Sequence, residues 1–259
     1  KRDTTHFDHR GPAPCWFEAA LHNKRAHLCG KKVLELYAGS ARLSRAFAAQ
    51  GVAAEAWDID YGTDNDLLKE VNVQRALREL RSGDVCFLWL AIPCSSWSRA
   101  RRKDGRGPGP LRDDGVSLWG FDHLEGKDLA KVQEANRLVK NSCRIIREAI
   151  TLFIPWVVEN PKTSRLWLIP QMQRFARQGA IYNEVHFCQF GEKWRNATFI
   201  LAWNLSDVAS ISRICGGIPW ICSRTGDRHV NLSGRDASGG LVHESRTTIS
   251  AFTLSPHCD

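Results

Sequence analysis

Apolar and polar positions alternate along the chain in a way that predicts strands separated by helices. The expected strands are short apolar runs at residues 33–37, 52–60, 84–92 and 152–160. The last two runs are almost unbroken, which is typical of strands buried on both faces of a sheet.

Segments with a helical period lie between and around these runs. Helices are expected over residues 15–26, 41–50, 71–80 and 126–151, and over 164–175 with a break at Pro170. A closing pair of strands is expected at 182–190 and 197–204. Strands that alternate with helices predict an α/β fold with a mostly parallel, doubly wound, Rossmann-like sheet, and the closing pair allows an antiparallel edge.

Changes in residue composition and periodicity divide the chain into three parts. We expect a leader and helix at residues 1–30, a catalytic domain at 31–204 and an irregular segment rich in Gly, Cys and His at 205–259. Residues 99–114 are dense in Arg, Gly and Pro and are expected to form a loop. The chain starts without Met and ends abruptly, so we expect it to be part of a larger polypeptide.

Composition narrows the class of protein. A formal net charge of +8 favours a polyanionic partner such as a nucleic acid. The nine cysteines lack the spacing of a disulfide framework, so we expect reduced thiols and an intracellular location. The sequence shows neither an apolar run long enough to span a membrane nor a secretory signal, and no membrane partner is expected.

Polar residues follow the expected strands at the edge where doubly wound sheets bind ligands. Gly39 forms a turn between the first strand and its helix, and Asp58 or Asp60 follows the second strand. A close backbone approach followed by an acid about 20 residues later suits a nucleotide-like ligand, although a plain strand-to-helix turn is the alternative. Ala41 and Arg42 stand where a dinucleotide fingerprint needs glycines, which argues against a nicotinamide oxidoreductase.

Cys94 directly follows the third buried run, within the segment Pro-Cys-Ser-Ser-Trp-Ser. A thiol at that place is a candidate nucleophile, whereas Cys86 and Cys143 lie within apolar periodicity and fit the core. Glu159 ends the fourth run, where a carboxylate serves either as an ion-pair partner or as a functional acid.

Together these segments resemble the cytosine carbon-5 DNA methyltransferase family. The similar motifs are ELYAG at 35–39, WDID at 57–60, PCSSWS at 93–98, ENP at 159–161 and FGEKWRNATFIL at 190–201, in the order the family has them. The resemblance covers roughly residues 33–203.

The resemblance implies an S-adenosylmethionine-dependent enzyme with a covalent mechanism. Cys94 would attack carbon 6 of cytosine, Glu159 would hydrogen-bond or protonate ring nitrogen 3, and Arg195 would contact the base carbonyl or orient Cys94. The cofactor would be bound by residues of the strand-end motifs, namely Tyr37, Ala38, Gly39, Ser40, Asp58, Ile59, Asp66 and Pro93.

The target base would have to leave a duplex stack to reach Cys94, so base flipping is implied. The expected nucleic-acid contacts come from the nucleophile motif and the basic loop after it: Ser96, Arg99, Arg101, Arg102 and Lys103. The alternative to nucleic-acid contact is that these basic side chains simply form a charged, solvated surface segment.

The motifs also depart from the family. The cofactor turn lacks the later glycines, Ser95 replaces the usual glutamine, Pro161 replaces the usual valine, and Arg195 alone remains of the arginines. No long segment follows that would form a normal target-recognition region. DNA is the expected substrate, in the nucleus if the source is eukaryotic. The alternatives are an RNA substrate and a catalytically silent nucleic-acid-binding module of the same fold.

Cys215, Cys222 and His229 recur at even intervals in the last segment, with His243, His257 and Cys258 further on. Cys and His are the ligands of structural zinc, but the spacing lacks a Cys-x-x-Cys pair. The sequence therefore favours ordinary loop residues, and no metal is expected.

Overall fold

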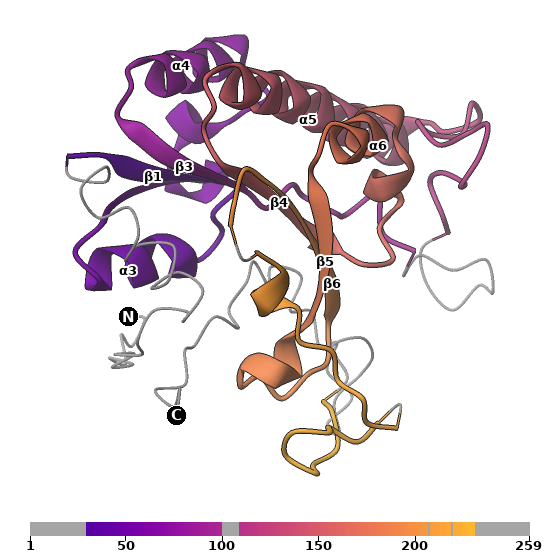
Figure 1. Cartoon of the computed structure of the whole chain (residues 1–259). Helices are drawn as coiled ribbons and strands as arrows, with labels where there is room; N and C mark the ends of the chain where they lie inside the picture. Colours follow the sequence, from indigo (N-terminus) through magenta and orange to yellow (C-terminus); the bar gives the residue numbers. More distant parts are fainter. Residues whose placement is uncertain (1–29, 100–108, 207, 219, 231–259) are drawn as a thin grey trace, which may run out of the picture.

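The computed structural model describes residues 30–99, 109–206, 208–218 and 220–230, which contain a six-stranded sheet (Figure 1). The strands are β1 (Lys32–Leu36), β2 (Ala53–Trp57), β3 (Val85–Leu90), β4 (Trp156–Pro161), β5 (Ile181–His186) and β6 (Ala197–Trp203). Their order across the sheet is β2-β1-β3-β4-β6-β5.

Strand direction decides which chain segments meet at the same edge. β2, β1, β3 and β4 pair in parallel, whereas β6 pairs antiparallel with both β4 and β5. The carboxyl ends of the other five strands and the start of β6 therefore lie at one edge of the sheet. This arrangement confirms the predicted α/β class, with a mostly parallel, doubly wound, Rossmann-like sheet.

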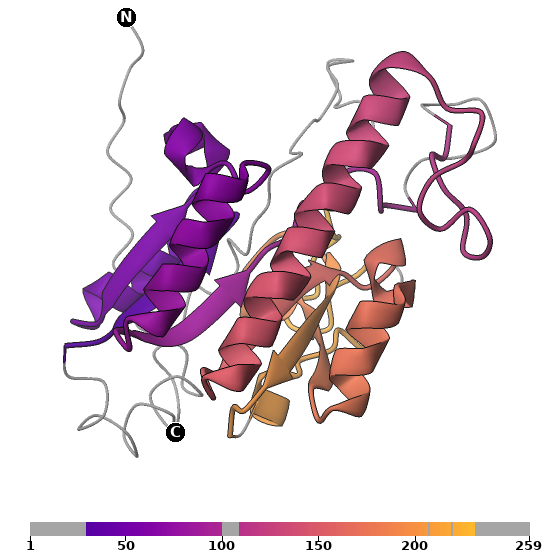
Figure 2. The ribbon, with the colours of Figure 1, turned by 90° about the horizontal axis from the view of Figure 1, so that it is seen from above.

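Helices cover both faces of the sheet (Figures 1 and 2). One face carries α3 (Arg42–Ala49), and the opposite face carries α4 (Glu70–Arg81), α5 (Gly126–Thr151) and α6 (Pro170–Arg177). Short 3-10 helices fill several connections: η1 (Ile59–Tyr61), η2 (Thr63–Asn65), η3 (Arg165–Leu168), η4 (Phe187–Phe190) and η5 (Val208–Ile211).

The two cores follow from the alternation of side chains along the buried strands. On β4, Trp156 and Val158 pack into the core under α5, while Val157 packs into the core on the α3 face. All three side chains are at most 1% exposed. Burying each large apolar side chain contributes about 1.5–3 kcal/mol, so the central strands fix the sheet that carries the site.

The predicted break at Pro170 is confirmed, because the helical segment is interrupted at Ile169 and resumes at Pro170. Pro170 occupies the first turn of α6, where its missing N–H costs no hydrogen bond, and the preceding residues form η3. The predicted strand 182–190 is shorter than expected, because β5 ends at His186 and the chain turns into η4. The helix predicted at 15–26 lies outside the described residues.

The segment after β6 contains little regular structure within the part that the structure describes. It holds η5 and one isolated antiparallel bridge between Ile221 and Arg228. Among the helices of the described ranges, none combines the length and the apolarity needed to cross a membrane.

Candidate active site

The candidate site lies at the point where the connections from successive strands change from one side of the sheet to the other. β1 pairs with β2 on one side and with β3 on the other, so the crevice at the carboxyl ends of β1 and β3 is the switch point of the fold. The turn at Gly39 follows β1, Cys94 follows β3, and Glu159 lies near the end of β4. Three of the motifs predicted from the sequence therefore share one edge.

The turn after β1 is tied to the turn after β2 through Asp58. The backbone N–H of Gly39 donates to Oδ2 of Asp58 at 2.8 Å, and the N–H of Asp60 donates to Oδ1 at 3.0 Å. Gly39 has a φ of 52°, which glycine adopts without steric cost. The Tyr61 hydroxyl also donates to the Gly39 carbonyl. The two turns thus form one rigid unit.

The neighbours of Gly39 face in different directions. The Tyr37 hydroxyl lies 2.8 Å from Oγ of Ser142 on α5, and burial raises the pKa of Tyr37. Ala38 is fully buried, and its N–H donates to the Trp57 carbonyl at 3.0 Å. Only Ser40 is exposed. The structure therefore places Tyr37 and Ala38 as supports of the turn.

The second turn presents acceptors beside an apolar side chain. Ile59 is 50% exposed although it is apolar, and Asp58 directly precedes it. Asp66 accepts the Leu68 N–H at Oδ1, at 2.9 Å, and this leaves further lone pairs on its carboxylate. Carboxylates accept hydrogen bonds from hydroxyl and amino groups, and an exposed apolar side chain can pack on a purine ring. These acceptors and the apolar surface beside them fit an adenosine-type cofactor.

Glu35 on β1 is a residue that the sequence analysis did not single out. It is fully buried, and its Oε2 accepts from the N–H of Ser44 at 2.8 Å and from the Ser44 hydroxyl at 2.5 Å. Burial raises the pKa of this carboxyl. Glu35 fastens the start of α3 to β1 and so supports the turn at Gly39. The sequence feature that could have identified Glu35 is its place as the one acidic residue within the apolar run at 33–37.

Cys94 begins a single turn that is closed by a backbone hydrogen bond. The Ser98 N–H donates to the Cys94 carbonyl at 2.8 Å, and the Cys94 side chain is half-buried. Pro93, predicted to contact the cofactor, is exposed next to it. Ser96, predicted to contact nucleic acid, is instead 1% exposed, because its hydroxyl accepts from Arg112 at 2.8 Å.

Arg112 is the main clamp of this turn and was not predicted. Its guanidinium donates to the Ser96 carbonyl at 3.2 Å and to Oδ1 of Asn136 on α5 at 2.9 Å, and it stacks 3.5 Å from the centre of the Trp97 ring. Arg112 is fully buried, and burial, together with nearby Arg165, lowers its pKa to about 10. The clamp connects the turn to α5.

Asn160 joins the nucleophile turn to the strand that bears Glu159. Its side-chain amide donates to the Ile92 carbonyl at 2.6 Å, two residues before Cys94. Register pairing of Leu90 with Val158 brings the two strand ends together in the same way. The ENP motif therefore positions the turn with its second residue as well as placing an acid beside it.

Burial raises the pKa of both Glu159 and Cys94. Glu159 is 6% exposed, its carboxyl makes no hydrogen bond within the described part of the chain, and burial raises its pKa to about 8. Burial raises the pKa of the Cys94 thiol to about 11, and the charge of Glu159 adds to this shift. Near neutral pH both groups are therefore mainly protonated. A buried neutral acid beside a thiol is an arrangement suited to proton transfer.

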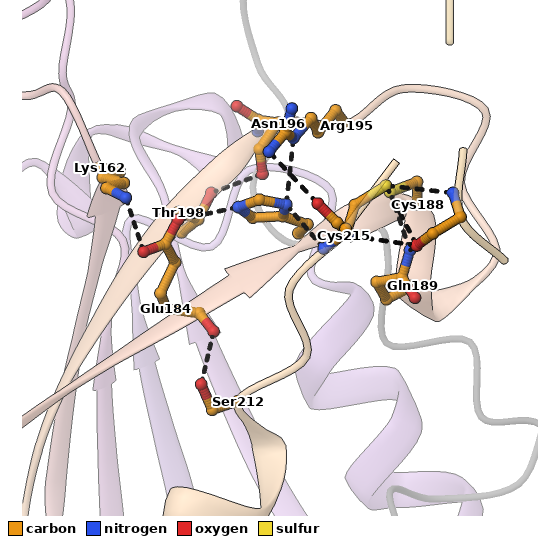
Figure 3. A network of polar contacts seen from close by, with 12 residues as sticks. Lys162, Glu184, Cys188, Gln189, Arg195, Asn196, Thr198, Ser212 and Cys215 are labelled. Carbon is orange, nitrogen blue, oxygen red and sulfur yellow. Dashed lines mark hydrogen bonds and ion pairs between the residues drawn. The ribbon is translucent and has the colours of Figure 1, made fainter. Parts of the chain in front are cut away.

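Arg195 lies at the same edge because β6 runs antiparallel to β4. Its Nε donates to Nδ1 of His186 at 3.1 Å, and its Nη2 donates to the Cys215 carbonyl at 3.3 Å (Figure 3). His186 Nδ1 also accepts the Cys215 N–H at 2.9 Å, so Nε2 carries the ring proton and donates to Glu184 at 2.8 Å. These donors of Arg195 are held by His186 and Cys215, not by Cys94.

The basic loop is described only in part. Arg99 pairs with Asp114 at 2.7 Å, and Asp114 also pairs with Arg165 at 2.8 Å. Arg101, Arg102 and Lys103 lie outside the described residues.

Comparisons with known proteins found similarity among solved structures. No protein-family model matches the chain, and no curated protein matches it in sequence. The S. pombe Dnmt2 methyltransferase is 15% identical, with 71% of this chain and 56% of that chain covered and a TM-score of 0.40. A mutant of Spodoptera frugiperda DNMT2 is 16% identical, with 69% and 51% covered and a TM-score of 0.36. This chain spans about half the length of these two structures.

Proposed function

We propose that the chain is an S-adenosylmethionine-dependent methyltransferase that methylates carbon 5 of cytosine in DNA through a covalent adduct with Cys94. One observation carries the proposal: a thiol and a buried, unpaired carboxyl lie at neighbouring strand ends, beside the glycine turn at the switch point. The motif order described above and the net charge of +8 support it.

The proposed roles follow from the chemistry of cytosine. The Cys94 thiol first loses its proton to solvent. Carbon 5 is a poor nucleophile until the resulting thiolate adds to carbon 6 and moves an electron pair toward ring nitrogen 3. A proton from Glu159 at nitrogen 3 neutralises that charge and leaves an enamine that is nucleophilic at carbon 5. When bound, S-adenosylmethionine supplies an electrophilic methyl group. Water then accepts the carbon-5 proton, and the electron pair left behind expels the Cys94 thiolate and restores the aromatic ring.

The protonated state of Glu159 suits the role proposed for it. A carboxyl with a pKa of about 8 is mainly protonated at neutral pH, so Glu159 can donate a proton without a further partner. In that state it carries no charge to oppose the Cys94 thiolate. Glu159 returns to its neutral form when it takes the proton back from nitrogen 3. The expelled Cys94 thiolate regains a proton from solvent, so the net proton released is the one from carbon 5.

The cofactor would be held by the two fused turns. The backbone at Gly39 allows close approach, Asp58 and Asp66 accept from hydroxyl and amino groups, and Ile59 offers an apolar surface. Pro93, which directly precedes Cys94, is exposed. Arg99, already paired with Asp114 at the surface, could exchange that partner for a phosphate of the nucleic acid.

The test is transfer of labelled methyl from S-adenosylmethionine to DNA and to RNA, with the hydrolysed nucleosides separated by mass spectrometry. Methylated cytosine from DNA is the expected product. Methylated cytosine from RNA alone would overturn the choice of polymer. Bound cofactor with no transfer to either polymer would favour a silent binding module.

The nucleophile is tested with a matched pair of variants. Cys94→Ser should abolish transfer and keep cofactor binding nearly intact, because serine is a far weaker nucleophile. Cys86→Ser, at a cysteine distant from the site along β3, should transfer normally. Equal turnover by Cys94→Ser and the unsubstituted protein would refute the assignment.

A further inference from the structure

Four side chains of the type that ligate metals converge at the end of β5. Cys188, Cys215, Cys222 and His229 each place one donor atom so that all four atoms lie within 4.8 Å of one another. The Cys215 Sγ lies 3.8 Å from Nε2 of His229. The sequence analysis considered three of these residues and missed Cys188, which is 27 residues before the next ligand.

These four side chains are buried, and the three cysteines lie outside the two cores of the sheet. Cys188, Cys215 and Cys222 are 0%, 2% and 5% exposed and form a cluster of their own, separate from the two cores of the sheet. All three are free thiols. His229 is 8% exposed, and its Nδ1 is buried without a hydrogen-bond partner. The other ring nitrogen, Nε2, faces the Cys215 sulfur, and it is the atom that a metal would bind.

Tight backbone turns hold the four residues in place. Cys188 lies in η4, directly after β5. The chain from Trp220 to His229 folds back on itself: the Cys222 N–H donates to the Asp227 carbonyl at 2.8 Å, and the His229 N–H donates to the Trp220 carbonyl at 2.7 Å. A Cβ at Gly217 would lie 2.0 Å from the carbonyl oxygen of Ile221. Only glycine allows this packing between Cys215 and Cys222.

We infer that Cys188, Cys215, Cys222 and His229 form a structural zinc site. A tetrahedral zinc ion with Zn–S bonds of ~2.3 Å needs ligand atoms about 3.8 Å apart, which is close to the spacing found here. Three thiols cannot all be paired in disulfides, whereas three thiolates and one imidazole complete a zinc coordination sphere. Binding would release the thiol protons to solvent.

Hydrogen bonds around the sulfurs suit thiolate ligands. The Ser223 N–H donates to the Cys215 Sγ at 3.3 Å, and its hydroxyl lies 3.5 Å from the same atom. The side-chain amide of Gln189 donates to the Cys188 Sγ at 3.4 Å (Figure 3). Such contacts stabilise negative charge on sulfur and orient the ligands. Because the protein supplies four ligands, the site is closed and structural in type.

The site also adjoins the network that holds Arg195. Cys215 would bind zinc through its sulfur while its backbone N–H and carbonyl contact His186 and Arg195. The metal would therefore fix the backbone on which these two side chains depend. This inference stands without the proposed function, because neither its geometry nor its test involves methyl transfer.

The test measures metal in the full chain. Protein purified with zinc in the medium and then freed of loose metal should contain one zinc per chain by plasma mass spectrometry. Cobalt exchanged into the site should give the absorption bands of tetrahedral coordination with thiolate ligands. A content near zero with no cobalt spectrum, or a disulfide between two of the three cysteines, would overturn the inference.

Variants locate the site. Cys222→Ser should lose the zinc, whereas Cys143→Ser, at a buried cysteine on α5, should keep it. His229→Cys supplies another zinc ligand and should retain one zinc per chain with an altered cobalt spectrum, which guards against loss through misfolding alone. Zinc retained at full stoichiometry in Cys222→Ser would assign it to other residues.

Discussion

At the scale of single residues, Glu159 shows how burial alone can prepare a chemical group. No partner among the described residues stabilises its charge, and burial raises its pKa to about 8 from an ordinary value of 4.5. Folding therefore favours the protonated form. This stabilisation is fully present below about pH 4.5 and is lost as the pH rises through about 8.

Glu159→Gln should flatten the dependence of stability on pH, because glutamine has a similar shape and stays neutral. The variant should gain stability relative to the unsubstituted protein between pH 5.5 and pH 9. Urea midpoints measured across that range check the expectation, with Glu134→Gln on the exposed face of α5 as control. Parallel profiles for the two proteins would mean that Glu159 is not buried as a neutral acid.

Asp58 belongs to the same scale, since one carboxylate connects two turns. Asp58→Ala should weaken binding of S-adenosylmethionine about 10- to 100-fold, the usual cost of losing a hydrogen bond to a charged group. Calorimetric titration measures this change. Asp60→Ala serves as the comparison, and Asp58→Asn keeps an acceptor for the Gly39 amide. An unchanged affinity in Asp58→Ala with a weaker one in Asp60→Ala would move the contact to Asp60.

At the scale of elements, the nucleophile turn depends on contacts from distant segments. Arg112 holds Ser96 and Trp97 against α5, and Asn160 holds the backbone at Ile92. The geometry of Arg112 requires a planar, forked donor, which lysine does not provide. The position of the Cys94 thiol therefore depends on residues that need never touch a substrate.

Arg112→Lys should lower the turnover number for methyl transfer and leave the affinity for S-adenosylmethionine unchanged. We also expect a loss of about 2 kcal/mol in the free energy of unfolding, since several buried acceptors lose their donor. Steady-state kinetics and urea unfolding measure the two effects. Arg147→Lys, at an exposed position on α5, should behave like the unsubstituted protein. Normal turnover in Arg112→Lys would show that the turn holds its shape without the clamp.

At the scale of the whole molecule, the candidate active site and the inferred zinc site share one edge of the sheet. The Cys215 N–H donates to His186, which lies at the end of β5 and accepts from Arg195. Removing zinc with a chelator should speed hydrogen exchange at the Cys215 amide and leave the amides of β1 unchanged. Exchange followed by mass spectrometry tests this coupling. Equal exchange in both forms would show that the segment stays ordered without metal.

The regular elements could be predicted from the sequence because burial produces periodic patterns. The predicted helix at 126–151 matches α5, and the four apolar runs correspond to β1–β4. Side-chain partners leave no such pattern. Arg112 sits in a run of charge that looks solvated, yet it is fully buried over Trp97. Cys188 is far in sequence from the other cysteines of its cluster, so only the turn after β5 reveals it.

The glycine pattern was a weaker guide than the backbone itself. Ala41 stands where a dinucleotide fingerprint needs a glycine, yet it has a φ of 51°, in the left-handed region that glycine favours. The turn shape is therefore kept although the residue type is not. Backbone contacts from Glu35 and Asp58 to this part of the chain supply the constraint.

The order of strands in the sheet also has a consequence for how the protein folds. The three central strands pair across long stretches of chain: Leu34 adjoins Leu88, and Leu88 adjoins Trp156. Pairings so distant in sequence carry a large loop-closure entropy and form slowly. The thiol, the acid and the glycine turn therefore come together only after most of the chain has been synthesised and has collapsed. Any fragment that stops before β4 would lack Glu159 and the strand that holds the Cys94 turn through Asn160.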